Sequence, residues 1–164
     1  MKKVALFLLV LIFIIIASTA CNGNNNSFDP VVEQEKATEV MNSVLTSFED
    51  QEKLAEGKTR DEANPIAWEK LVEKNSEALS KDLNEEDQKR LLYVLTINKA
   101  EDLDNGGTKS NLLFSKEAKI KNISLNEPEE TFTFDIERLD VDHTLVTLEK
   151  QEGVWKITTV QDPE

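Results

Sequence analysis

Apolar residues recur every three or four positions through the first half of the chain, which is the spacing of one buried helix face. The first helix is predicted to begin at Asp29 and Pro30, because an Asp side chain caps free backbone N–H groups and Pro fits the first turn. Gly57 is predicted to end this helix. Its inward positions are Ala37, Val40, Met41, Val44, Leu45 and Phe48.

Two further helices are predicted from the same period. Asn64 and Pro65 mark the start of the second, whose apolar positions are Trp68, Leu71, Val72, Ala78 and Leu79. The third begins at Asn84, where Asp87, three residues later, approximates a capping box. "DNGG" at 104–107 is predicted to end it. Its inward positions are Leu91, Leu92, Leu95 and either Tyr93 or Val94.

After Gly107 the period falls to two, which is typical of a strand with one wet face. Phe132, Phe134 and Ile136 alternate with polar residues. Residues 118–125 alternate as well, but the phase slips at Asn122, which predicts a β-bulge. Residues 144–150 and 154–160 are two further strands around "KQEG", where Gly153 is expected to take a positive φ. "DVDH" at 140–143 is the predicted turn before them.

Helices followed by strands predict an α+β domain. Three N-terminal helices are expected to pack on one face of a four-stranded antiparallel sheet. We assign this single domain to residues 29–164, a length that supports one hydrophobic core.

The first 20 residues have the organisation of a signal peptide, with a lysine pair, an apolar stretch at 4–16 that is too short for a membrane span, and small residues before Cys21. This segment resembles the lipobox of bacterial lipoproteins, although Ser18 stands where that motif most often has Leu. The resemblance implies a diacylglycerol on the Cys21 thiol and cleavage just before it. Residues 21–28 are then the lipidated Cys and a flexible tether. Two alternatives are a lipid-free secreted protein cleaved at Ala20 and an uncleaved anchor.

The chain carries a formal net charge of −13 at pH 7. This charge argues against nucleic acid as a partner and against flat binding to anionic lipid, because both need a basic face. It favours either a cationic partner or simple solubility. Cys21 is the only cysteine, so the domain has no intramolecular disulfide.

Residues able to carry catalysis are few, and we assign no catalytic residue. His143, the one histidine, is either an acid–base group or a solvated residue of its turn. Tyr93 is expected to be a core ring with its hydroxyl at the surface. "EDLDNGG" at 101–107 lacks the ligand spacing of an EF-hand, and one histidine is too few for a typical zinc site. No metal or cofactor is therefore predicted.

Trp68 and Trp155 have core spacing, and the alternative is that one lines an apolar pocket between helix and sheet. Together with Tyr93 they are the candidate pocket residues. The order of elements and the segment "VTLEKQEGVWKITTV", with its motif Gly153, Trp155 and Ile157, resemble the nuclear-transport-factor-two-like fold. That resemblance implies a curved sheet folded around the helices and a conical pocket, which serves catalysis in some members and binding or assembly in others.

The leading prediction is a lipid-anchored protein on the extracytoplasmic face of the cell membrane, acting as a non-enzymatic binding or interaction domain. Its partner would be a protein, a wall component or a small molecule. One alternative is a pocket enzyme of the same fold that uses acid or base catalysis. Another is a structural cell-envelope factor without a small ligand.

Overall fold

The structure is a computed structural model that describes residues 28–48, 58–102, 108–114, 118–138 and 142–163. Its helices are α2 (Pro30–Leu45), α3 (Arg60–Asn75) and α4 (Glu85–Leu95). None of the helices in the described part of the chain has the length and apolar character that crossing a membrane requires. The predicted signal peptide and Cys21 lie outside the described residues.

Within the described residues, the strands form two sheets. β1 (Thr96–Asp102) and β2 (Thr108–Phe114) make an antiparallel hairpin. β3 (Lys119–Asn126), β4 (Thr131–Arg138), β5 (Asp142–Gln151) and β6 (Val154–Gln161) make a four-stranded antiparallel sheet in sequence order. The predicted α+β class, with three helices before this sheet, is confirmed. The β1–β2 hairpin was not predicted.

Two of the three predicted helix starts are confirmed. The Asp29 carboxylate accepts a hydrogen bond from the backbone N–H of Val31 at 3.1 Å. The Asn84 side-chain oxygen accepts a hydrogen bond from the backbone N–H of Asp87 at 3.0 Å. The start at Asn64 was wrong: α3 begins at Arg60, capped by Thr59, and Pro65 lies inside the helix.

The physical reason for the earlier start of α3 is a capping box, which the spacing of apolar residues does not reveal. Thr59 Oγ1 accepts from the backbone N–H of Glu62, while the Glu62 carboxylate accepts from the backbone N–H of Thr59. These reciprocal bonds satisfy free N–H groups one turn before Pro65. The helix tolerates Pro65 at the cost of one backbone hydrogen bond.

The predicted helix ends were also wrong. α2 ends at Leu45, and Gly57 lies outside the described residues. α4 ends at Leu95 rather than at 104–107, where residues 103–107 are likewise outside the described part. Thr96 takes an extended backbone and its hydroxyl donates to the carbonyl of Leu92 at 2.6 Å, which closes the last turn as β1 begins.

The period-two pattern after residue 117 is confirmed. Phe132, Phe134 and Ile136 are fully buried. The β3–β4 register shifts between Ile120 and Asn122, where the bulge was expected. The β5–β6 turn has φ angles of 53° at Glu152 and 85° at Gly153, the two positive values that a tight hairpin requires.

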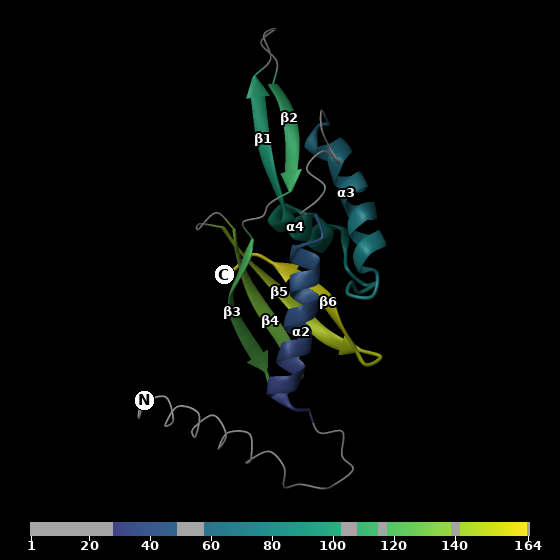
Figure 1. The fold of residues 1–164 in the computed structure, drawn as a ribbon, viewed down its shortest axis with the longest axis vertical. Coiled ribbons are helices and arrows are strands. Elements are labelled where there is room, and N and C mark those ends of the chain that lie inside the picture. The colour runs from purple at the N-terminus through teal and green to yellow at the C-terminus, as the bar shows by residue number, and fades with distance from the viewer. Residues whose placement is uncertain (1–27, 49–57, 103–107, 115–117, 139–141, 164) are drawn as a thin grey trace, which may run out of the picture.

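One hydrophobic core lies between the sheet and the helices. α2 and α4 pack against β6, whereas α3 packs chiefly against α4 and β2 (Figure 1). The expectation that all three helices lie on the sheet is therefore corrected for α3. The largest fully buried side chains of this core include Met41, Leu71, Leu91, Phe132, Phe134 and Ile157.

Candidate functional site

Trp155 belongs to the core. It is 3% exposed, and its ring lies 5.2 Å from that of Phe132 and 6.5 Å from that of Phe28, measured between centroids. Its indole N–H donates to Glu33 Oε2 at 2.9 Å. The edge of Trp155 also reaches a surface hollow of about 340 Å³ beside Ala78. Packing, rather than a pocket wall, is the main role of this side chain.

Glu33 is the buried acid that holds this corner together. Besides Trp155, it accepts hydrogen bonds from Lys150 and Lys36, each at 2.8 Å. The bond from Lys150, followed by that from Lys36, lowers the pKa of Glu33 to about 2. The carboxylate is therefore charged at neutral pH and links the start of α2 to the start of β6.

Trp68 lies elsewhere, in a groove between α3 and α4. The groove has a volume of about 440 Å³, and Trp68 is half-buried in its wall. The lining residues recur at helical spacing on both helices, so one stripe of each faces the other. They are Asp61, Asn64, Pro65 and Trp68 from α3, and Glu85, Gln88, Lys89 and Leu92 from α4.

A second hollow continues this groove toward the sheet. Its volume is about 540 Å³, and it shares Asp61, Asn64 and Lys89 with the first. Tyr93 lies in its wall, 40% exposed. We call the two hollows together the α3–α4 groove. The remaining lining residues are Glu86, Arg90, Thr96, Thr144 and Asp162.

The structure therefore brings two of the three candidate pocket residues to one surface. Trp68 and Tyr93 lie along the α3–α4 groove, and Trp155 lies in the core. Val94, and not Tyr93, is the inward residue of the pair that the sequence left open, since it is 2% exposed.

Carboxylates outnumber cationic side chains in the α3–α4 groove. Both cations are already paired, Lys89 with Glu85 at 2.8 Å and Arg90 with Glu86 at 2.6 Å. The hydrogen bond to Glu85 raises the pKa of Lys89. Asp61, which borders both hollows, adds a further negative charge, so the groove as a whole is electronegative.

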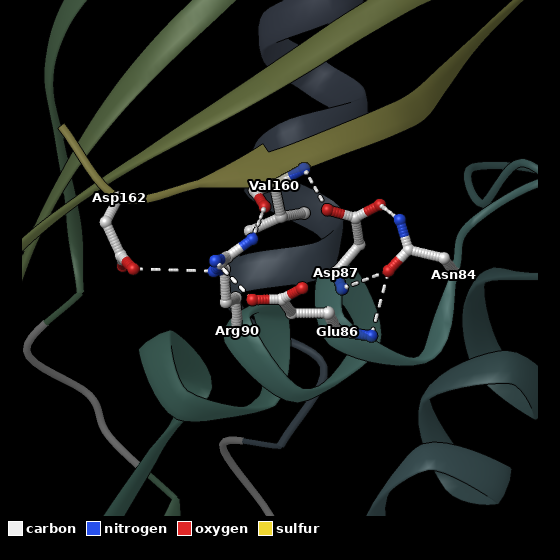
Figure 2. Close-up of polar contacts among 6 residues, drawn as sticks. All are labelled: Asn84, Glu86, Asp87, Arg90, Val160 and Asp162. Carbon is white, nitrogen blue, oxygen red and sulfur yellow. Dashed lines mark hydrogen bonds and ion pairs between the residues drawn. The ribbon is translucent and has the colours of Figure 1, made fainter. Parts of the chain in front are cut away.

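A polar network fixes α4 to the sheet beside this groove (Figure 2). Asp87 is 6% exposed, and its carboxylate accepts from the backbone N–H of Val160 at 3.1 Å and from the Asn84 amide at 2.6 Å. Arg90 lies between Glu86 and Asp162, and its guanidinium donates to the carbonyl of Val160 at 3.4 Å. α4, which forms one wall of the groove, is thus bonded to β6 through both the backbone N–H and the carbonyl of Val160.

Arg138 fixes the other end of α4. This buried guanidinium donates to the carbonyls of Tyr93 at 2.9 Å and Thr96 at 2.6 Å, and to Asp142 at 2.7 Å. It also lies 4.0 Å above the centroid of the Tyr93 ring. A cation at the C-terminus of a helix satisfies its free carbonyls and opposes its dipole. Sequence reasoning missed Arg138, although it continues the inward alternation of Ile136.

His143 lies on the sheet face opposite the helices. Its Nδ1 is 2.8 Å from Asp135 and its Nε2 is 3.9 Å from Glu137. These carboxylates alternate with the buried Phe134 and Ile136, so His143 is not part of the α3–α4 groove. Asp140 of the predicted turn lies outside the described residues, and Asp142 is already in β5.

Within the described ranges, no group of three or more His, Cys, Asp or Glu side chains is placed to hold a metal ion. Comparison with family models, with curated proteins and with solved structures finds no match.

Proposed function

We propose that this protein is a lipoprotein, anchored through Cys21 on the extracytoplasmic face of the cell membrane, whose domain binds a partner without chemical reaction. The observation that carries the proposal is the α3–α4 groove, an elongated surface whose wall contains the half-buried Trp68 and the exposed Tyr93 along a carboxylate-rich rim. The lipobox-like segment before Cys21 supports the anchor.

The positions of tether and groove agree with this arrangement. Phe28, the first described residue, stacks on Phe132 at 6.1 Å and contacts Trp155 at the start of β6. Val160, which is bonded to Asp87 of α4, lies near the other end of the strand. The rise per residue of a strand separates these points by roughly 17 Å. The described domain therefore begins beside the end of β6 that lies away from its bond to α4.

The groove favours a cationic segment with an apolar side chain. Trp68 and Pro65 offer apolar surface beside the buried Leu92, while Asn64 offers an amide for hydrogen bonding. Since the cations of the rim are paired with acids of the same helix, the remaining charge is negative. A lysine- or arginine-rich amphipathic peptide satisfies both features.

Catalysis by acid or base is less well supported. The Tyr93 hydroxyl donates to Asp142 at 3.3 Å, and the hydrogen bond from Arg138 lowers the pKa of Asp142. A general acid near neutral pH needs a carboxyl whose pKa is raised. This neighbour of Tyr93 is instead held as a carboxylate, so it does not suit the role of a general acid.

The nuclear-transport-factor-two-like resemblance remains part of the proposal, with one refinement. That fold implies a curved sheet around a conical pocket, whereas the inward side chains of β4 are fully buried in the core. We therefore place binding at the outer α3–α4 groove and not between sheet and helices.

The test uses Trp68 as a fluorescent reporter in the full chain carrying Trp155→Phe, which leaves one tryptophan. A lysine-rich amphipathic peptide should shift its emission saturably, and the same peptide with glutamate for lysine should not. Asp61→Lys should weaken binding by at least about tenfold, the loss of one close charge pair. Asp82→Lys, the same change at an exposed acid outside the groove, should leave it unchanged.

Two results would contradict this function. The first is the absence of any emission change with the cationic peptide. The second is an equal loss of affinity in the Asp61 and Asp82 variants, which would mean that net charge attracts the peptide to no particular surface.

A further inference from the structure

The outer edge of β6 has partners for its backbone at two positions. The N–H of Ile157 donates to the carbonyl of Ala78 at 2.8 Å, and its carbonyl accepts from the N–H of Ser80 at 3.0 Å. At Val160, the N–H and the carbonyl are both bonded to side chains of α4 (Figure 2). Two unrelated segments of the fold thus satisfy this edge.

Trp155 is an outward-facing position of the same edge without such a partner. In an antiparallel ladder the backbone groups alternate between the two neighbouring sides, so residues two apart face the same side. The β5–β6 register is regular between Trp155 and Ile157, and the N–H of Ile157 faces outward. The N–H and carbonyl of Trp155 therefore face outward too. Among the described residues, none forms a hydrogen bond with either group.

The segment that covers Ile157 turns away before it reaches Trp155. A continued parallel strand would donate the N–H of Ala78 to the Trp155 carbonyl, but that N–H donates to the carbonyl of Asn75 at 2.9 Å in a turn. Trp155 is nevertheless only 3% exposed. Because buried backbone groups nearly always have a hydrogen-bond partner, these two groups indicate a place for a ligand or an ordered water.

A hollow of about 340 Å³ lies at this position, and Trp155 lines it. We call it the β6-edge hollow. Its apolar wall consists of Val40, Ala78 and Val154 beside Trp155. A volume of this size is at the lower end of small-ligand sites. The other described lining residues are Ser43, Lys74, Asn75, Ser76 and Glu77.

The polar side chains of the β6-edge hollow favour an uncharged ligand. The Asn75 amide already donates to Ser47 Oγ at 2.6 Å and accepts from Ser43 at 3.3 Å, and Lys74 already donates to the Ser47 carbonyl at 2.6 Å. Lys74 and Glu77, the charged residues among the described lining, have opposite signs. The backbone of Trp155 therefore offers a ligand one donor and one acceptor beside an apolar wall.

We propose that the β6-edge hollow binds a short, uncharged, extended peptide segment with an apolar side chain, paired with Trp155 as an added strand. A peptide backbone supplies both the acceptor for the Trp155 N–H and the donor for its carbonyl. Leu79 already occupies the next position through its bridge to Ile157, so the bound strand is only a few residues long. The β6-edge hollow shares no lining residue with the α3–α4 groove, so this site does not depend on the proposed function.

The test uses the full chain carrying Trp68→Phe, which leaves Trp155 as the one tryptophan. A blocked alanine–valine–alanine tripeptide, which is uncharged, should change its emission saturably. The same tripeptide with all three backbone nitrogens methylated cannot donate to the Trp155 carbonyl, and it should bind at least about tenfold more weakly. A hollow that holds only water would give no saturable change, and this result would overturn the proposal. Equal binding of the methylated peptide would overturn it as well.

Two matched variants test the position of the peptide. Val154→Glu places a charge in the wall of the hollow and should weaken binding at least about threefold, because an apolar side chain then meets a charge. Val72→Glu is the same change at a valine outside the hollow, with 37% exposure against 41% for Val154, and should have no effect. Equal losses in both variants would contradict the assigned site. Asp61→Lys, which tests the groove, should leave this binding unchanged, so the two proposals can fail separately.

Hydrogen exchange tests the free backbone directly. In the unliganded full chain, the Trp155 amide should exchange faster than the Ile157 amide, which is bonded to Ala78. Saturation with the tripeptide should slow the exchange of Trp155 and leave that of Ile157 unchanged. Equal protection of the two amides before the peptide is added would show that Trp155 already has a partner, and the proposal would then be wrong.

Discussion

Truncating Trp155 to Ala should remove a large part of the stability of the domain. Its side chain fills core space against Phe132 and Phe28. Loss of a buried aromatic of this size costs about 3–5 kcal/mol. The lost hydrogen bond to the charged Glu33 adds about 1–3 kcal/mol, and because both terms arise at one site they overlap. We expect about 4–6 kcal/mol in total, against about 5–15 kcal/mol for an ordinary domain.

Two further variants separate the contributions. Trp155→Phe keeps most of the ring packing and removes the N–H donor, so it should cost about 1–3 kcal/mol. Trp68→Ala is the matched control, the same truncation at a half-buried tryptophan in the groove, and should cost at most about 2 kcal/mol.

Urea unfolding of residues 28–164, followed by far-UV circular dichroism, gives the free energy of unfolding for each variant. A loss below about 1 kcal/mol for Trp155→Ala would refute the assignment of the inward face of β6. A loss for Trp155→Phe as large as that for Ala would show that the hydrogen bond, and not the packing, carries the stability.

Three more predictions concern the anchor and the buried acids. Cys21→Ala should release the protein from membranes or leave an unprocessed precursor on a gel, and continued membrane retention of a cleaved chain would contradict the lipid anchor. The pKa of Glu33 is lowered to about 2, so the stability that its carboxylate gives the fold is complete above about pH 5 and is lost as the pH falls toward this pKa. Near pH 7, Glu33→Gln should therefore lower the free energy of unfolding by about 1–3 kcal/mol, and a value in the lower part of this range is expected because the lysine partners of Glu33 are partly exposed. The difference from wild type should shrink near pH 3, and a constant difference would exclude this linkage. Asp87→Ala should lower the free energy of unfolding by about 2–3 kcal/mol and remove hydrogen-exchange protection of the Val160 amide. Glu86→Ala, the control at an exposed acid of the same helix, should cost about 0–1 kcal/mol. Full protection of the Val160 amide in the Asp87 variant would be inconsistent with the hydrogen bond between them.

The elements that could be predicted from the sequence are those with local causes. The caps at Asp29 and Asn84 and the alternation of Phe132 and Phe134 depend on neighbours along the chain. The end of α4 could not be predicted in this way. Besides the local bond of Thr96 to the Leu92 carbonyl, it depends on Arg138, which reaches the carbonyls of Tyr93 and Thr96 from the sheet.

The candidate site likewise has features that can be predicted from local sequence and features that depend on tertiary packing. Trp68 and Tyr93 could be named from residue type and spacing, but their common groove depends on the packing of α3 against α4. Asp61, which joins the two hollows, is an ordinary acid in a chain with 32 acidic residues, and nothing in its local sequence distinguishes it.

The buried acids Glu33 and Asp87 do carry a sequence signal, although an overall acidic composition hides it. Glu33 stands four residues before Ala37, and Asp87 stands four residues before Leu91, so each continues the apolar stripe of its helix. An acid at such a position is buried on folding and needs a partner from another element. Both find one on β6, Glu33 near its start and Asp87 near its end. Two directional bonds at opposite ends of one strand therefore set the positions of α2 and α4 on the sheet. Because α4 forms one wall of the α3–α4 groove, the shape of the proposed binding surface depends on an acid that does not line it.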